Sequence, residues 1–477
     1  MIYINIDRHQ GDSLTKQIYR SLKESILSGI LQQGEKLPSS RELAKDLNVA
    51  RNVVIESFDQ LIAEGYAYSK SGSGTYVCEA VRLERPAETP AVRKREDHKQ
   101  IPDIISFRTG IPDLNSIPIK KWAQAYREII TTVKPTQLDY QNPFGEYELR
   151  YQLSLYLNRV RGVYTIPENI LITNGAAQAF SLLCRLVSDD GYALVENPLS
   201  YGILHTLESN HVKIKTIGMD EYGMLTMELP HIPPRLIFTT PSHQFPTGVT
   251  LPARRRIELV QYARKYHTYI VEDDYDSEFR FDGSPIQSMQ QLDPRWVIYV
   301  GTFSKTFMPA LRMGYMILPD SLCRNMEEAK FVADLHSPIL DQLTMARLIE
   351  SGQFDLHIRK MRKLYCARRN FLIRCLKESF GDMVSISGAE AGMHLIARFK
   401  NIRFDEKLLQ EIEDRGIQIS AASKHWLPAG SSSQHESSLI FGYGNTDIKS
   451  IETGVNRLYT ILKEHSLRPQ IDEEQLV

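Results

Sequence analysis

The stretch that decides the fold runs from Trp296 to Leu318 and reads WVIYVGTFSKTFMPALRMGYMIL. It opens with an apolar run of strand length, and small residues then lead to Lys305. A lysine normally lies on a polar face, whereas this one follows a segment with the pattern of a buried strand. Lys305 is therefore a helix-terminus lysine, a salt-bridge partner or a nucleophile.

Similar apolar runs recur throughout the chain from about residue 102 onward, alternating with helical patterns. Examples are NILITNG (169–175), YALVEN (192–197), RLIFTTPS (235–242) and TYIVEDDYD (268–276). This alternation predicts an α/β fold in which helices cover a mostly parallel sheet. Ligands of such sheets bind at the carboxyl ends of the strands, and each candidate motif of this region follows a predicted strand.

The first two such motifs are a small-residue turn and an acidic cluster. Gly175, Ala176 and Ala177 open a helix, where backbone N–H groups can approach an anion. The cluster EDDYD (272–276) has three interpretations: a Mg²⁺ or Ca²⁺ site, a solvated turn, or one buried carboxylate that pairs with a cationic ring nitrogen.

The order of the motifs favours the third interpretation. Lys305 lies 32 residues after Asp273, and Arg312 lies seven residues after Lys305. Together these groups meet the needs of pyridoxal phosphate (PLP). The lysine forms a Schiff base with the aldehyde, and the aspartate keeps the ring nitrogen protonated. The arginine and the helix N-terminus hold the phosphate.

Residues 1–80 are predicted to form a separate small domain. Leu14, Ile18, Leu22 and Ile26 make one helical stripe, and Ser39 begins a second helix with the capping pattern S-x-x-E. A third helix spans RNVVIESFDQLIAEG (51–65), and the strands YAYS (66–69) and GTYV (74–77) flank a glycine-containing turn. Helix, turn, helix and wing is a geometry that reads DNA.

The candidate DNA contacts lie at the start of the third helix and in the wing. Arg51 and Asn52 are placed to reach base edges. The candidate phosphate contacts are Ser39, Arg41, Lys70, Ser71, Ser73 and Thr75. The alternatives are a winged helix that contacts protein, or a three-helix core with surface arginines. Residues 1–80 carry nine Lys/Arg against ten Asp/Glu, which is not the strongly basic balance of a simple DNA binder.

Both parts of the chain also resemble known families. The segments LPSSRELAKDLNVARNVVIESFDQLIAEGY (37–66) and GSGTYV (72–77) resemble the winged helix-turn-helix of GntR-type bacterial repressors. From about residue 102 the chain resembles a fold-type I aminotransferase, through ISFRTGIPDLNSIP, YQNPFGEYELRYQLSLYLNRVRGV, TNGAAQA, PSHQFPTGVTLP, EDDYDSEF and GTFSKTFMPALRMGY, in that order. The pairing resembles the MocR/GabR group of transcription regulators.

The resemblance implies a domain organisation and a role for each site residue. It implies a winged helix-turn-helix in residues 1–80, a linker in 81–101 and a PLP-binding domain in 102–477. Lys305 becomes the Schiff-base lysine, Asp273 the partner of the ring nitrogen and Tyr275 a donor to the ring hydroxyl. The other implied contacts are Ala176, Ala177, Thr302 and Arg312 around the phosphate, Tyr201 stacked on the ring, and Tyr140 reaching the partner subunit's phosphate in a homodimer.

Two departures from the aminotransferase pattern bear on function. Phe245 replaces the asparagine that supports the ring hydroxyl, so His243 or Gln244 is the candidate substitute. Gly444 and Asn445 stand where amino-acid-binding relatives carry an arginine for the substrate carboxylate. These departures favour a regulator that binds an operator with two half-sites and senses PLP, an amine or an amino acid. The alternatives are a working aminotransferase with a DNA-binding domain, and a dimerisation scaffold without a cofactor.

The composition of the 477-residue chain narrows the classes of protein to which it can belong. Its 57 basic and 58 acidic side chains indicate no particular partner. The five cysteines form no CxxC, which is typical of reduced thiols in a cytoplasmic protein and not of a disulfide frame or a zinc site. We predict no metal site, no export signal and no membrane span.

Overall fold

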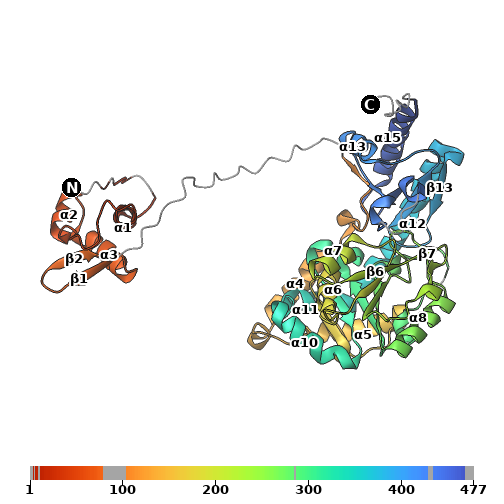
Figure 1. Ribbon diagram of the computed structural model, residues 1–477, viewed down its shortest axis with the longest axis horizontal. Coiled ribbons are helices and arrows are strands. Elements are labelled where there is room, and N and C mark those ends of the chain that lie inside the picture. The colour runs from red at the N-terminus through yellow and green to blue at the C-terminus, as the bar shows by residue number, and fades with distance from the viewer. Residues whose placement is uncertain are drawn as a thin grey trace. The chain divides into compact units, whose positions relative to one another are not determined.

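The computed structural model describes residues 4, 6–8, 11–78, 104–283, 286–427 and 433–467. The chain divides into two compact units, 1–99 and 100–477, which Figure 1 draws with the N-terminal unit in red. The predicted linker 81–101 lies outside the described residues. Among the described helices, none has both the length and the hydropathy to cross a lipid bilayer.

The first unit contains the predicted three helices and hairpin. They are α1 (Leu14–Leu27), α2 (Ser40–Asp46), α3 (Arg51–Ala63) and the antiparallel strands β1 (Ala67–Lys70) and β2 (Gly74–Val77). The Ser39 side chain accepts the N–H of Glu42 at 3.2 Å, so the predicted cap does start α2. Ile18, Leu22 and Leu61 are fully buried where α1 packs on α3. β1 begins one residue later than predicted.

A seven-stranded sheet forms the centre of the second unit, in the order β4-β12-β11-β10-β9-β5-β6. Its strands are β4 (Ile170–Thr173), β5 (Ala193–Glu196), β6 (Ile214–Ile217), β9 (Leu236–Thr239), β10 (Tyr269–Asp274), β11 (Val297–Thr302) and β12 (Gly314–Ile317). Only β12 runs antiparallel to its neighbours, so the predicted mostly parallel sheet is confirmed.

Helices cover both faces of this sheet. Ile170 and Ile172 of β4 belong to one hydrophobic cluster and Leu171 to another, because successive side chains of a strand point to opposite faces. The helices of this part are α4 (Ile119–Thr132), α5 (Tyr147–Arg161), α6 (Ala176–Cys184), α7 (Tyr201–Ser209), α8 (Ala253–Tyr266), α9 (Phe303–Thr306), α10 (Asp320–Asp334) and α11 (Ile339–Glu350).

The long helix α12 (Gln353–Phe380) leads into a second, smaller sheet. Figure 1 shows this sheet with α13 and α15 at one end of the second unit. Its order is β13-β14-β17-β16. The elements here are β13 (Val384–Ser387), β14 (His394–Phe399), α13 (Glu406–Asp414), β16 (Ser420–Ala421), α14 (Ser433–Glu436), β17 (Ser438–Gly442) and α15 (Ile448–Leu467).

Two short strand pairs complete the second unit. β3 (Ile105–Ser106) pairs in parallel with β15 (Ile417–Gln418), which ties residues 105–106 to the small sheet. β7 (Met219–Asp220) and β8 (Gly223–Met224) form a hairpin. The β3 pairing matters for the site, because the loop that follows β3 reaches Lys305.

Candidate functional site

Lys305 lies at the carboxyl end of β11. Thr302 caps α9 by accepting the N–H of Ser304 at 3.1 Å, and the short helix that follows carries Lys305. The Lys305 Nζ donates to the carbonyl oxygen of Gly110 at 2.7 Å. Burial lowers the pKa of Lys305, against the opposing effect of Asp276 and Asp273. A larger fraction of neutral amine follows, as a nucleophile requires.

At the end of β10, the carboxylates of the acidic cluster have different partners. Glu272 accepts the hydroxyl of Ser288 at 2.6 Å, and Asp274 pairs with the buried Arg161 at 2.7 Å. Asp273 and Asp276 both line the cavity that contains Lys305, and Asp276 accepts a hydrogen bond from His243 Nδ1 at 3.0 Å. All four carboxylates are buried, so the cluster is not a solvated turn.

Asp273 has an unusual electrostatic environment. Burial, together with Asp274 and Asp276, raises its pKa to about 7. A cationic ring nitrogen at this place would return the carboxylate to its ionised form. Nearby, the Tyr275 hydroxyl donates to the carbonyl oxygen of His243 at 3.0 Å.

Most of the predicted cofactor residues line one cavity of about 390 Å³, a volume suited to a small-molecule ligand. They are Lys305, Asp273, Tyr275, Ala176, Ala177, Tyr201, Thr302 and Arg312. Two predicted residues do not line it. Tyr140 is 79% exposed, and His243 lies behind Tyr275. The cavity also contains residues that were not predicted to bind the cofactor, among them Thr109, Gly110, Asp276, Ser304, Met393, His394 and His425.

The N-terminus of α6 and Arg312 form the cationic end of this cavity. The N-cap Gly175 has φ 86°, and no side chain caps the helix. The positive φ favours glycine here, and a Cβ at Gly175 would lie 2.8 Å from Arg312 Nη2 and push the guanidinium away. Free helix N–H groups and a guanidinium together suit a phosphate dianion.

The rings of Phe245, His394 and His425 form part of the cavity wall. Phe245, at the position of the missing asparagine, packs against His394 and His425 with ring centroids 5.1 and 4.9 Å away. Burial lowers the pKa of His394 to about 3 and that of His425 to about 4. Both rings are therefore neutral near pH 7.

A cation does lie beside Gly444, although the local sequence supplies none. Arg368 of α12 donates to the Gly444 carbonyl oxygen and pairs with Asp113 at 2.8 Å. Asp113 belongs to the loop that carries Gly110. Arg368 therefore already forms an ion pair with a carboxylate of its own chain. It lies 76 residues from Gly444 in the sequence, so no local motif indicates that the two residues meet.

In the first unit, the predicted DNA contacts lie on the surface. Arg51 and Asn52 are exposed at the start of α3, and the Arg51 Nε donates to the Ser40 hydroxyl at 3.2 Å. Exposed residues elsewhere are Ser39, Arg41, Lys70, Ser71 and Ser73, with Thr75 half-buried. Ser73 is held by a 2.6 Å hydrogen bond to the Tyr76 hydroxyl.

Comparison with protein families finds two matches. Residues 14–77 match the bacterial regulatory proteins of the gntR family, and residues 102–429 match aminotransferase class I and II. The chain is 33% identical to the probable rhizopine catabolism regulatory protein MocR of Rhizobium meliloti, over 95% of this chain and 94% of that protein. It is 30% identical to the pyridoxine biosynthesis regulator PdxR of Corynebacterium glutamicum, over 93% and 95%.

Solved structures resemble the second unit. A kynurenine aminotransferase of Pyrococcus horikoshii matches with a TM-score of 0.69 and 27% identity, over 77% of this chain and 92% of that one. The α-aminoadipate aminotransferase LysN of Thermus thermophilus, solved with a phosphopyridoxyl-leucine compound, matches with a TM-score of 0.68 and 26% identity, over 76% and 92%.

Proposed function

Because the chain belongs to the GntR-type transcription regulators that carry an aminotransferase class I and II domain, we propose that PLP, or an amine or amino acid that acts at the PLP site, controls its DNA binding. The observation that carries the proposal is the cavity itself, in which Lys305, Asp273 and the α6 N-terminus meet. We also propose that residues 1–80 and 102–477 act as separate domains joined by 81–101.

The residues of the cavity fit PLP on chemical grounds. PLP supplies an electrophilic aldehyde and a ring that accepts electron density. Lys305 would hold the aldehyde carbon, and Asp273 would accept a hydrogen bond from the protonated ring nitrogen. Tyr275 would turn its hydroxyl hydrogen from the His243 carbonyl to the ring hydroxyl, while Arg312 and the N–H groups of Ala176 and Ala177 would hold the phosphate. Tyr201, which is 42% exposed at the cavity mouth, would cover the ring.

A homodimer would connect this site to two operator half-sites. Tyr140 is 79% exposed and lies near His336, with ring centroids 6.3 Å apart. In a dimer it would be available to the phosphate of the partner subunit. Binding at the cavity needs to change the free energy of DNA binding by only about 1–3 kcal/mol to act as a switch.

A residual aminotransferase activity is the second candidate, because Lys305 and Asp273 are both present. The ion pair between Arg368 and Asp113 argues against efficient turnover, since it occupies the arginine that is hydrogen-bonded to Gly444. We propose that a single half-reaction with an amine takes place without sustained turnover. Release of keto product in excess of one equivalent per chain, with a second keto acid present, would instead establish the enzyme.

The decisive experiment joins a covalent and a DNA readout. PLP is added to the full-length protein, which is then reduced with borohydride and digested, and the modified peptide is sequenced by mass spectrometry. The expected modification is on Lys305, and footprints upstream of the protein's own gene should change with PLP. Lys305→Ala should lose both effects, whereas Lys407→Ala, at an exposed lysine of α13, should keep both. Modification of a residue other than Lys305, or a footprint that does not change when PLP is added, overturns the proposal.

A further inference from the structure

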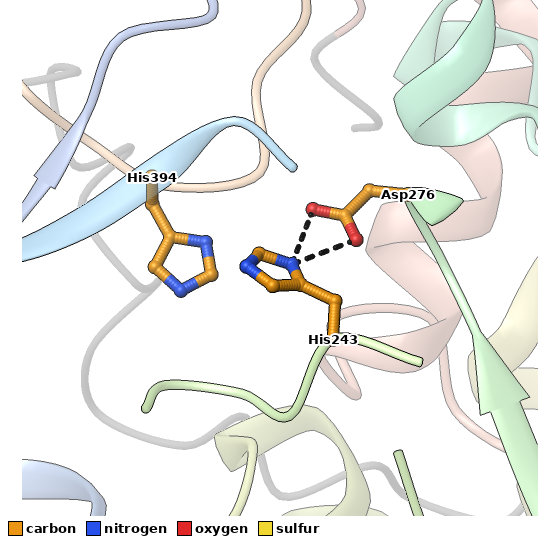
Figure 2. Close-up of side chains that lie close together, drawn as sticks. All are labelled: His243, Asp276 and His394. Carbon is orange, nitrogen blue, oxygen red and sulfur yellow. Dashed lines mark hydrogen bonds and ion pairs between the residues drawn. The ribbon is translucent and has the colours of Figure 1, made fainter. Parts of the chain in front are cut away.

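Three side chains that commonly bind metals meet beside the cavity, as Figure 2 shows. His243 follows β9, Asp276 follows β10 and His394 begins β14. Their exposed fractions are 3%, 1% and 2%. One ligand-type atom from each lies within 4.8 Å of the other two.

The hydrogen bonds of the two histidine rings determine which nitrogen of each ring carries a proton. The Asp276 carboxylate can only accept, so the His243 Nδ1 that lies 3.0 Å from it carries a proton. The Pro246 carbonyl can only accept, so the His394 Nε2 that lies 3.0 Å from it carries a proton. With both rings neutral, His243 Nε2 and His394 Nδ1 are the nitrogens with free lone pairs. Burial opposes protonation of His243, but Asp276 raises its pKa above the ordinary value, so an ion bound at Nε2 has to displace a proton there.

One of these lone pairs has no partner in the described part of the chain. His243 Nε2 is buried and makes no hydrogen bond. In Figure 2 it points toward the His394 ring, and the two ring centroids are 4.9 Å apart. Buried polar atoms are nearly always satisfied, so this nitrogen has room for a further partner on the side of the His394 ring.

We propose that His243 Nε2 and His394 Nδ1 bind a divalent transition-metal cation of the zinc class. Neutral imidazole nitrogens suit Zn²⁺, Ni²⁺ and Cu²⁺. Asp276 would orient the ligating His243 through a hydrogen bond to its other ring nitrogen, Nδ1, as carboxylates commonly do at metal sites. Because Asp276 and His394 line the cavity that contains Lys305, the remaining coordination positions of the ion face that cavity.

Two substitutions remove the ligand atoms and keep the other hydrogen bond of each ring. His243→Asn retains an N–H donor toward Asp276 but lacks Nε2. His394→Gln retains an N–H donor toward Pro246 but lacks Nδ1. The matched control is His205→Asn, because the His205 side chain is 65% exposed. Thermal unfolding of each variant checks that it is folded.

The full-length protein is stripped with a chelator and titrated with Zn²⁺ by calorimetry. We expect one ion per chain and about tenfold or greater weakening in His243→Asn and His394→Gln, with no change in His205→Asn. Asp276→Asn should weaken binding by about 10–100-fold, as other outer-shell partners do. Equal affinity in all four variants, or no binding by the unmodified chain, overturns the proposal.

Cobalt absorption gives a readout that needs no variant. Co²⁺ bound by histidine nitrogens gives only weak visible bands, whereas binding by any of the five cysteines adds an intense thiolate band in the near ultraviolet. We expect the first spectrum. The second, or a crystal structure grown with Zn²⁺ that places only water between the rings, contradicts the assignment.

Discussion

Lys305 and Gly110 are 195 residues apart in the chain, yet the lysine Nζ donates a 2.7 Å hydrogen bond to the glycine carbonyl. A Cβ at Gly110 would lie 2.7 Å from that Nζ, and the φ of this residue is 71°. The loop after β3 is therefore shaped to the lysine. It is anchored by Asp113, whose partner is Arg368.

Gly110→Ala should impair PLP capture more than stability alone explains. The left-handed backbone costs a non-glycine residue roughly 1–2 kcal/mol, and the new methyl group displaces Lys305. Gly352→Ala is the matched control, with φ 70° and no atom near its Cβ. Both should lower the melting temperature similarly, but only Gly110→Ala should weaken PLP binding, by about tenfold in absorbance titrations. Equal PLP affinities of the two variants would show that this loop does not contribute to the PLP site.

Asp273→Asn should stabilise the protein free of PLP at alkaline pH. The pKa of Asp273 rises from 3.8 to about 7 on folding, so the folded state binds an extra proton between these values and stability falls as pH rises through them. At pH 8 the full penalty applies, on the order of 4 kcal/mol, from about three units at 1.36 kcal/mol each.

Urea unfolding at pH 5 and pH 8 checks this prediction. The advantage of Asp273→Asn should be largest at pH 8 and smaller at pH 5. Asp382→Asn, at an exposed position, should show no such trend. An Asp273→Asn protein that is less stable than the unmodified chain at pH 8 would refute the assigned shift.

Arg312→Gln should distinguish PLP from pyridoxal, which lacks the phosphate. Hydrogen bonds to a charged group contribute about 1.5–3 kcal/mol, so the affinity for PLP should fall by roughly 10–100-fold. The affinity for pyridoxal should not change. Arg324→Gln, at an 89% exposed side chain, is the control. Parallel losses for both aldehydes would mean that Arg312 acts on the fold and not on the phosphate.

The two classes of DNA contact should respond differently to substitution. Arg51→Ala should cost about 1–3 kcal/mol on the specific operator, because a base-reading side chain is lost. Lys70→Ala should weaken binding to all sequences and reduce the salt slope by about one. Fluorescence anisotropy between 50 and 200 mM salt measures both. Arg20→Ala, on α1 and paired with Asp12, should change neither.

Leu22→Ala should unfold the first unit and spare the second. Leu22 is fully buried, and such a truncation typically costs about 2–5 kcal/mol, which is a large part of the stability of a small domain. DNA binding should be lost while PLP uptake remains. Loss of PLP uptake as well would show that the two domains do not fold independently.

Much of the fold and part of the site follow from local sequence. Period-four apolar residues and the Ser39 cap define the helices of the first unit, because these signals act within one turn. Apolar runs followed by small or charged residues place Asp273, Ala176 and Lys305 at strand ends. Since parallel strands present these ends on one edge, their meeting in one cavity could be predicted without coordinates.

The contacts between distant segments needed the tertiary structure. Arg368 reaches Gly444 and Asp113 across 76 and 255 residues, and His243 meets His394 only where the two sheets adjoin. No periodicity encodes such pairs, because strand order and helix packing decide them. The sequence determined which segment carries Lys305 and on which sheet edge it lies. The three-dimensional packing alone decided that Gly110 holds its amine, that Asp113 occupies the nearby arginine, and that one histidine nitrogen is left without a partner.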